Sequence, residues 1–234
     1  MPPILVLGAT GRVGSAAIKY LLEKDSKIHA LVRTPSKLPS SPNLTFTIQE
    51  GQFPQRKQLE SIISEMKPTT IVTAMGALQY LFFGKLFVTD GMKDLVEIIN
   101  DLKPAFPVKL IVLSTAGVSV EGDKRPFSDK FITAACGLVA NYRDNLALCA
   151  YAKTVSSPYV EWVLVRPTNF VEGDAGPDFT VTEFIECSVF DSLAKSHISN
   201  IGKFMANLAG DQSEWAKWKG KMPFLRNVPT PEVN

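Results

Sequence analysis

Residues 4–22 read ILVLGATGRVGSAAIKYLL, an apolar run followed by three glycines at intervals of three and then by a helix-like stretch. Gly8, Gly11 and Gly14 lie at the turn from an expected strand, Ile4–Leu7, into an expected helix, Arg12–Lys24. Backbone without side chains can approach a phosphate closely at such a turn, and the start of a helix offers N–H groups and the positive end of a dipole. The turn therefore predicts a site for a phosphate-bearing cofactor, although a strand end at Gly8 and close helix–strand packing at Gly14 would use the same residues.

Short β-rich runs alternate with helical patterns along the rest of the chain. Further helices are expected at about 55–66, at Thr89–Leu102 and, as one long helix, at about 128–155. Further strands are expected at Lys27–Val32, Leu44–Ile48, Thr70–Ala74, Lys109–Leu113 and Val160–Val165. Strands that are apolar nearly throughout and are separated by helices favour a parallel sheet covered on both faces. We therefore predict an α/β fold with one doubly wound parallel sheet, a Rossmann fold, in a single domain over residues 1–234.

The composition argues against several classes of site and partner. A hydrophobic fraction of 45% and a charged fraction of 21% are ordinary for a globular protein, and a net charge of +2 gives no broad basic surface for nucleic acid. Three scattered cysteines, two histidines and no C-x-x-C pair argue against a disulfide framework, a zinc site and a Cys/His catalytic pair. The N-terminus lacks the layout of a signal peptide, and no run reaches the about 20 apolar residues of a membrane helix. We expect a cytoplasmic protein that binds neither nucleic acid nor membrane.

The glycine turn also carries a resemblance to a known family. Gly-Ala-Thr-Gly-Arg-Val-Gly at 8–14 differs from the G-x-G-x-x-G of classical dehydrogenases and resembles the G-A-T-G-x-x-G of the extended and atypical short-chain dehydrogenase/reductase superfamily, most of all its NmrA-like, NAD(P)-binding branch. Further matches are Leu31-Val32-Arg33 and the segments 88–91, 113–117, 163–167 and 196–199. The resemblance covers about residues 3–222. It implies a small C-terminal substrate-binding lobe that starts at about residue 168.

The end of the second expected strand bears on the choice of cofactor. An NAD site usually has an Asp or Glu there for the ribose 2′-hydroxyl, whereas this strand ends in Arg33, with Arg12 in the glycine turn and Lys37 nearby. A carboxylate would repel a 2′-phosphate, and a guanidinium can bind it with two parallel hydrogen bonds. The sequence therefore predicts NADP(H), with a solvated surface position as the alternative for Arg33 and still more for Lys37.

The resemblance implies further contacts with the cofactor. In such proteins the ends of the fourth and fifth strands lie beside the nicotinamide and its ribose, in agreement with the rule that ligands bind at the carboxyl ends of parallel strands. The loop after the sixth strand then borders the nicotinamide and the substrate, which places Phe170 there too. The cofactor-binding residues implied are Gly8, Thr10, Gly11, Arg12, Val13, Gly14, Arg33, Ala74, Met75, Gly76, Ser114, Pro167, Thr168 and Asn169.

The usual catalytic pair of the superfamily, a Tyr with a Lys four residues later, is missing from the expected region. Tyr142 is followed at that spacing by Leu146. The chain does hold the spacing at Tyr20 and Lys24, but on the first helix, where we expect it to be coincidental. A proton for the reaction would then come from water or from Ser114, Thr115 or Tyr142, which are the catalytic candidates.

Three functions remain compatible with these observations. The first is an atypical NADPH-dependent reductase of a small apolar carbonyl, enone or quinone-like substrate, with catalysis by positioning. The second is a redox sensor that binds NADP(H) and a protein partner without turnover, and the third is a cofactor-bound enzyme of non-redox chemistry. The short chain favours the first over the second, because little sequence is left to build a partner surface. Both a monomer and a homodimer remain open.

Several other segments have weaker signals. The apolar segment Gly76–Val88 is a candidate wall of the substrate pocket, with core packing or a dimer contact as equal alternatives. His197 is expected to make a structural hydrogen bond, and Trp215 and Trp218 to dock the C-terminal segment against the core. The spacing of three acidic residues is typical of an exposed helix face, namely Glu183, Glu186 and Asp191.

Overall fold

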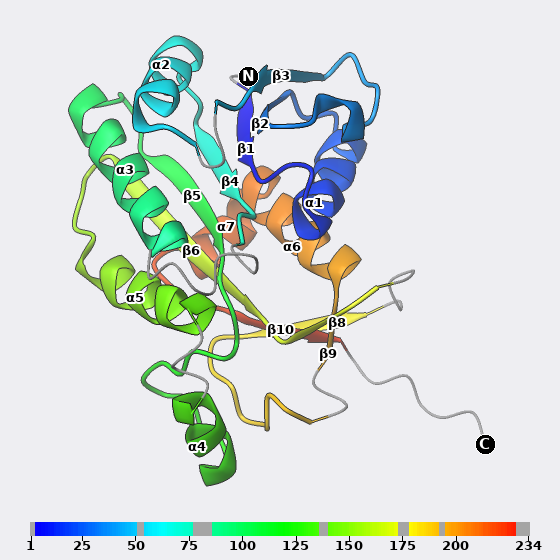
Figure 1. Ribbon diagram of the computed structural model, residues 1–234, viewed down its shortest axis with the longest axis vertical. Helices are drawn as coiled ribbons and strands as arrows, with labels where there is room; N and C mark the ends of the chain where they lie inside the picture. Colours follow the sequence, from blue (N-terminus) through cyan, green and yellow to red (C-terminus); the bar gives the residue numbers. More distant parts are fainter. Residues whose placement is uncertain are drawn as a thin grey trace.

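A computed structural model describes residues 3–50, 54–76, 86–135, 140–172, 178–191 and 195–227 of the chain. Its centre is an eight-stranded sheet with the strand order β3-β2-β1-β4-β5-β6-β10-β8 (Figure 1). The strands are β1 Ile4–Leu7, β2 Ile28–Val32, β3 Leu44–Ile48, β4 Thr70–Thr73, β5 Val108–Leu113, β6 Val160–Pro167, β8 Phe179–Thr182 and β10 Phe224–Asn227. All pairs from β3 to β6 and on to β10 are parallel, and β10 pairs with β8 in the antiparallel sense.

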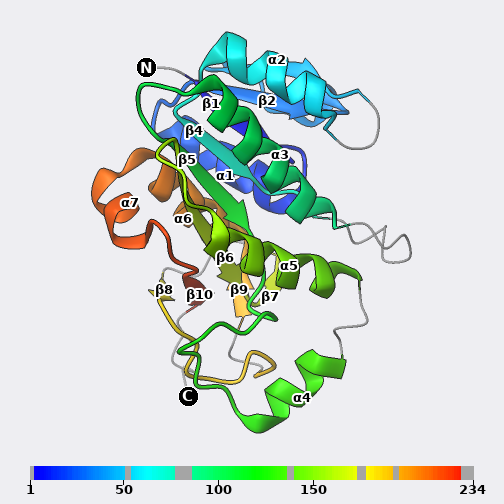
Figure 2. The same ribbon diagram turned by 90° about the vertical axis from the view of Figure 1, so that its left-hand side faces the viewer.

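Helices cover both faces of this sheet (Figures 1 and 2). One face packs against α1 Arg12–Glu23, α6 Ile198–Gly210 and α7 Gln212–Trp218. The other face packs against α2 Arg56–Met66, α3 Phe87–Leu102 and α5 Ala140–Thr154. Side chains alternate along β1, so that Leu5 and Leu7 pack against the layer of α2, α3 and α5 and Val6 packs against the layer of α1, α6 and α7. The predicted α/β fold with a doubly wound, mostly parallel sheet is confirmed.

The C-terminal third differs from the sequence expectation in its detail. Two short strands, β7 Asn169–Val171 and β9 Lys195–His197, form a separate parallel pair, and neither they nor β8 and β10 were predicted. The expected single helix at about 128–155 holds two helices, α4 Phe127–Ala135 and α5, with α5 against the sheet and α4 beyond its edge (Figure 2). The segment with Glu183 and Glu186 is not helical, so the prediction of an exposed helix face there was wrong. Among the remaining elements is a short 3₁₀ turn, η1 Pro35–Lys37.

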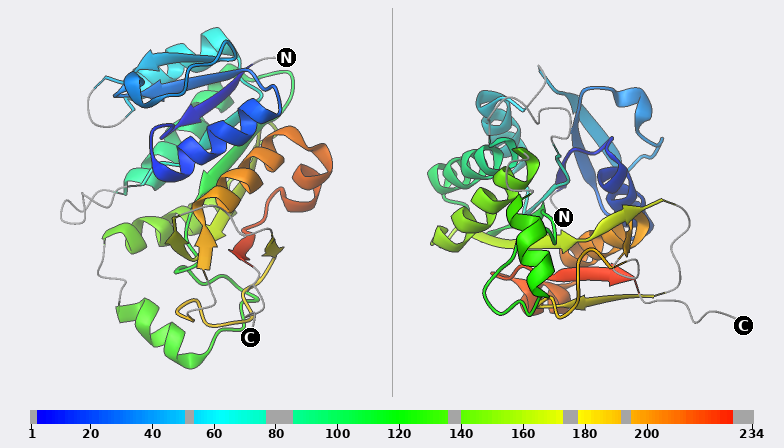
Figure 3. Two further views of the ribbon diagram at one scale, coloured as in Figure 1. Left: turned by 90° about the vertical axis from the view of Figure 1, so that its right-hand side faces the viewer. Right: turned by 60° about the horizontal axis from the view of Figure 1, so that its bottom comes forward.

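Helices α1 and α6 lie side by side and approach closely at Gly202 (Figure 3). A Cβ at Gly202 of α6 would lie 2.6 Å from the carbonyl carbon of Ala16 and 2.7 Å from the amide nitrogen of Ala17 in α1. Beside this contact the hydroxyl groups of Tyr20 and Ser199 share a hydrogen bond of 2.6 Å. The structure therefore gives Tyr20 a place in helix packing, with its hydroxyl occupied.

A buried group of charges ties the C-terminal strands to the loop that follows β5. Arg166 of β6 donates to both carboxylate oxygens of Asp123, at 2.8 and 3.3 Å, and both side chains are 0% exposed. Its Nε also donates to the carbonyl of Met222, just before β10, and its Nη2 to that of Glu183, just after β8. Arg125 donates to Asp123 and to the carbonyl of Val118. One carboxylate and two guanidinium groups thus hold the loop after β5 against three strands.

The partners of Asp123 set its charge state. Burial by itself raises the pKa of this carboxyl, but hydrogen bonds from Arg166 and from the backbone N–H groups of Val120 and Ile185, with the charge of Arg166, lower its pKa below the ordinary value. A carboxyl whose pKa is lower in the folded state stabilises the fold above its unfolded-state pKa. That stabilisation is lost as the pH falls through the folded-state pKa.

We expect Asp123→Asn to lower the free energy of unfolding by about 3–5 kcal/mol, because it leaves the buried guanidinium group of Arg166 without its countercharge. The matched control is Glu186→Gln, which removes one surface carboxylate, 69% exposed, that pairs with Lys124. Its effect should stay within about 0.5 kcal/mol. Urea unfolding at neutral pH measures both variants, and equal losses would contradict a structural role for the buried pair.

Candidate active site

The turn between β1 and α1 is built by backbone contacts that exclude side chains. Gly8 has a φ of +75°, and its carbonyl accepts a hydrogen bond of 3.0 Å from the N–H of Gly11. A Cβ at Gly8 would lie 2.8 Å from the carbonyl carbon and oxygen of Ala74, at the end of β4. The left-handed conformation and this close approach both require glycine. The turn therefore presses directly against the start of the loop that leaves β4.

Helix α1 begins in contact with the same turn. A Cβ at Gly14 would overlap the carbonyl oxygen of Gly8 and lie 2.8 Å from its carbonyl carbon. The N-cap residue is Gly11, so no side chain caps the helix, and its first turn contains no acidic residue. The N–H groups of residues 12–14 have no partner within the helix, as in the first turn of any α-helix. An uncapped helix start behind an exposed glycine fits the diphosphate of a dinucleotide cofactor.

The N-terminus of α3 lies at the same edge of the sheet but is already capped. The carboxylate of Asp144, from α5, accepts hydrogen bonds from the N–H groups of Val88 at 2.7 Å and Thr89 at 2.9 Å. It also accepts one from the Thr89 hydroxyl at 2.7 Å, and Asp144 is buried. A carboxylate in this position occupies the place that an anionic ligand would take. This contact could not be predicted from the sequence, because the partners are 55 and 56 residues away from Asp144.

The three cationic side chains near the turn lie on different sides of it. Arg33 directly follows β2, next to β1 in the sheet, and is exposed. Within the described residues its side chain has no hydrogen bond or ion pair. Lys37, at the end of η1, is also exposed. Arg12 turns instead toward the β6 side, where its guanidinium lies 5.6 Å from the centre of the Phe170 ring and 3.4 Å from Glu172 Oε1. Arg33 is therefore the guanidinium left available on the β2 side.

The end of β4 forms the next part of this edge. The N–H of Ala74 donates to the carbonyl of Leu7 at 3.0 Å, and Met75, half-buried, packs against the core. Gly76 is exposed, and a Cβ placed there would meet no atom of the described residues within 4 Å. Most of the Gly76–Val88 segment, residues 77–85, lies outside the described residues.

The catalytic candidates separate into an inner and an outer position. The Ser114 hydroxyl is buried, 3.8 Å from Sγ of Cys149 in α5, and so faces the interior. Thr115 and Tyr142 are half-buried and both lie near Gly117, where a Cβ would lie 3.4 Å from Thr115 Oγ1 and 3.6 Å from Tyr142 Cδ2. The structure therefore places Thr115 and Tyr142 around the same glycine, whereas Ser114 is buried.

Hydrogen bonds place the loop after β6. The Pro167 carbonyl accepts from the N–H of Ala116 at 2.8 Å, which joins this loop to the one after β5. The N–H and the hydroxyl of Thr168 both lie 2.9 Å from Ser196 Oγ, which donates in turn to the carbonyl of Leu225. Thr168 is thus occupied in joining β7 to β9 and β10, whereas Asn169 is exposed. The resemblance included Ser196 in the matching segment 196–199 but assigned it no role, since a buried serine carries no pattern of its own.

His197 keeps a structural position next to this loop. Its N–H donates to Asn227 Oδ1 at 3.0 Å, while its Nδ1 is buried and has no partner among the described residues. Only the backbone of His197 makes a hydrogen bond within the described residues, so the structural hydrogen bond expected of its side chain is not seen there. Within the described ranges, no cluster of three His, Cys, Asp or Glu residues is placed to bind a metal ion. None of the helices that the structure describes is both long and apolar enough to span a membrane.

Comparisons with known proteins agree with this geometry. A family model described as NAD(P)H-binding matches residues 8–209. No curated protein matches the sequence. Among solved structures, the oxidoreductase ylbE from Lactococcus lactis is similar with a TM-score of 0.71 and 18% identity over 97% of this chain and 92% of that chain. A short-chain dehydrogenase/reductase from Veillonella parvula in complex with NADP is similar with a TM-score of 0.70 and 14% identity over 98% of this chain and 95% of that chain. At these identities the two structures show a shared fold.

We expect Gly14→Ala to weaken NADPH binding at least about tenfold, a cost of about 1.4 kcal/mol, because the new methyl group overlaps the Gly8 carbonyl and displaces the turn. Gly76→Ala should keep the melting temperature of the wild type, since its Cβ meets no atom of the described residues within 4 Å. Any loss of NADPH affinity in this variant would then come from contact between the new methyl group and the bound cofactor. Calorimetric titration and thermal unfolding measure both.

Gly210→Ala, near the end of α6, serves as the control because its Cβ would make only an ordinary contact with Lys24. Its NADPH affinity should equal that of the wild type. Unchanged NADPH affinity in Gly14→Ala would show that the turn does not hold the cofactor.

Proposed function

This chain belongs to the family described as NAD(P)H-binding, which resembles the atypical short-chain dehydrogenases/reductases, and we propose its function from this membership. The class that follows is an NAD(P)-dependent oxidoreductase. Within this class we propose an NADPH-dependent reductase that acts on a small apolar carbonyl, enone or quinone-like compound. The observation that carries the proposal is the uncapped start of α1 behind the glycine turn, with the exposed Arg33 beside it.

The preference for NADP(H) rests on Arg33. In sites for NAD an acidic residue at the end of the second strand accepts from the ribose 2′-hydroxyl. Arg33 occupies this place, is exposed, and has no partner within the described residues. A guanidinium favours the 2′-phosphate by charge and by paired hydrogen bonds. The NADP bound by the Veillonella parvula protein agrees with this choice.

The chemistry requires a hydride and a proton. NADPH, when bound, supplies the hydride to the substrate carbon. The hydroxyl of Thr115 or Tyr142, or a water held by them, donates the proton to the substrate oxygen, so that a carbonyl becomes an alcohol. The loop after β6, with the exposed Asn169 and Phe170, borders the substrate and begins the proposed substrate-binding lobe. The buried Arg166–Asp123 pair holds the loop after β5, which carries Thr115, against β6.

The position four residues after Tyr142 favours a second candidate function. Leu146 stands there, 48% exposed, in the place of the usual lysine that lowers the pKa of the tyrosine. A protein without that cation can bind NADP(H) as a redox sensor and pass its state to a partner without turnover. Consumption of NADPH in the presence of an acceptor distinguishes the two functions.

We expect Arg33→Ala to weaken NADPH binding by about 1.5–3 kcal/mol, which is the usual loss for a hydrogen bond to a charged group, and to leave NADH binding unchanged. The control is Lys27→Ala, which removes another exposed cation at the opposite end of β2. Fluorescence titration with both cofactors measures the affinities. Equal affinity of the wild type for NADPH and NADH would contradict the role of Arg33.

We expect the wild type to consume NADPH only when an acceptor such as an aryl ketone, an enone or a benzoquinone is added. Tyr142→Phe or Thr115→Val should lower turnover about 10²-fold or more, as for loss of a proton donor, while NADPH affinity stays constant. Tyr20→Phe, a matched loss of one hydroxyl in helix packing, should keep full turnover. If no member of a broad acceptor panel is reduced while NADPH still binds, the sensor function replaces the reductase.

A further inference from the structure

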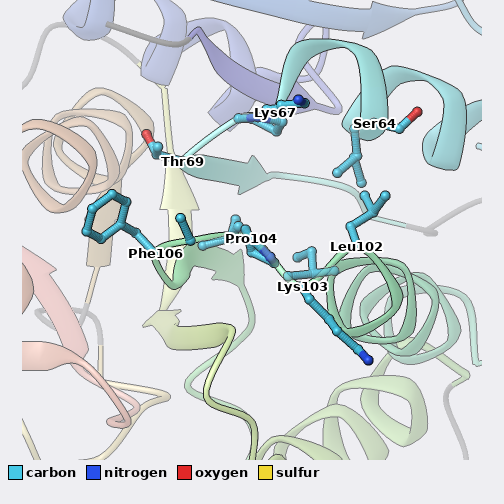
Figure 4. Close-up of a pocket in the computed structure, with 12 residues that line it drawn as sticks. Ser64, Lys67, Thr69, Leu102, Lys103, Pro104 and Phe106 are labelled. Atoms are coloured by element: carbon cyan, nitrogen blue, oxygen red, sulfur yellow. The ribbon is translucent and has the colours of Figure 1, made fainter.

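A pocket lies at the edge of the sheet opposite to the proposed cofactor site. It is enclosed by the last turns of α2 and α3 and by the starts of β4 and β5, and it has a volume of about 430 Å³ (Figure 4). The ligand site of a doubly wound sheet lies at the carboxyl ends of its strands. This pocket lies at their amino ends, so neither the cofactor nor the proposed substrate uses it.

The lining of this pocket is mostly apolar. Ile63 of α2 and Val108 of β5 contribute buried surface, and Leu102 and Phe106 contribute side chains that are 41% and 77% exposed. A phenylalanine exposed to this degree beside a hollow is unfavourable for a surface that faces only water. The volume lies within the range of about 300–1,000 Å³ that is usual for small-molecule sites. The pocket therefore suits a ligand with a compact apolar body.

Both charged side chains that line the pocket are positive. Lys67 and Lys103 extend from the ends of α2 and α3, on opposite sides of Pro104 in the close-up (Figure 4). No carboxylate is part of the lining, and neither lysine has an ion pair within the described part of the chain. A second copy of the chain would bring four ammonium groups together at this face, which disfavours a symmetric dimer here. The charge complements an anion.

From this combination we propose that the pocket between α2 and α3 binds an amphipathic carboxylate, a small molecule with an apolar body and one carboxylate. The apolar body lies between Ile63, Val108 and Phe106, and the carboxylate lies at the mouth. Lys67 and Lys103 extend in opposite directions in the close-up, so their long side chains turn toward the mouth when the carboxylate binds (Figure 4). This site is independent of the proposed reductase activity. The lysines also complement the negative ends of the α2 and α3 dipoles. The test must therefore distinguish ligand binding from a role in which the lysines only stabilise the helix ends.

The test compares three probes with the same chain, namely octanoate, octylammonium and 1-octanol, below their aggregation concentrations. We expect saturable one-to-one binding of octanoate by calorimetry and at least about tenfold weaker binding of octylammonium, the size expected for two partly exposed ion pairs. The double variant Lys67→Gln/Lys103→Gln should bind octanoate no better than octanol. The double variant Lys27→Gln/Lys203→Gln removes two exposed cations elsewhere and should bind octanoate as the wild type does.

A blocking variant locates the site. Ala105 is an exposed lining residue, so Ala105→Trp should fill the mouth and abolish octanoate binding, with NADPH affinity unchanged. Retained NADPH affinity in every variant shows that the fold is intact and separates this result from the proposed function. Equal binding of octanoate and octanol, or octanoate binding that survives loss of both lysines, would overturn the proposal. So would the absence of saturable binding by any of the three probes.

Discussion

The close contact between the start of α1 and the carbonyl of Gly8 is the constraint on which the cofactor edge depends. The cofactor edge is the proposed cofactor site at the carboxyl ends of the parallel strands. Since no Cβ fits at Gly14, the helix begins directly behind the turn, and its first N–H groups face the edge of the sheet. The same turn presses against Ala74, so the carboxyl ends of β1 and β4 lie in register beneath it. The glycines of this turn therefore determine where α1 begins and where its dipole points.

Two buried carboxylates then shape the rest of this edge. Asp144 caps α3 with a carboxylate, whereas no side chain caps the start of α1. Asp123, held by Arg166, fixes the loop that carries Thr115 against β6 and against the strands β8 and β10. Each carboxylate acts through backbone groups far away in the sequence. The cofactor edge thus depends on polar contacts from the C-terminal half of the chain as much as on the glycine turn.

The sequence predicted the strands from β1 to β6 because most of them are apolar nearly throughout, with β3 and its two threonines as the exception. It did not predict β7 to β10, which are three or four residues long and are held by partners such as Ser196 and Leu225 rather than by a pattern of their own. The glycine turn was visible in the sequence because its requirement is local. The capping by Asp144 and the inward position of Ser114 were not, because they depend on how α5 packs.

In the proposed complex NADPH binds across the carboxyl ends of the strands, with its diphosphate at α1 and its 2′-phosphate at Arg33. Amide hydrogen–deuterium exchange of the full chain with and without NADPH tests this most directly, because it reports on each segment separately. We predict slower exchange in residues 8–15 and 31–38 on addition of NADPH, with no change in residues 99–106 at the pocket between α2 and α3. Unchanged exchange in residues 8–15 at saturating NADPH would contradict the account.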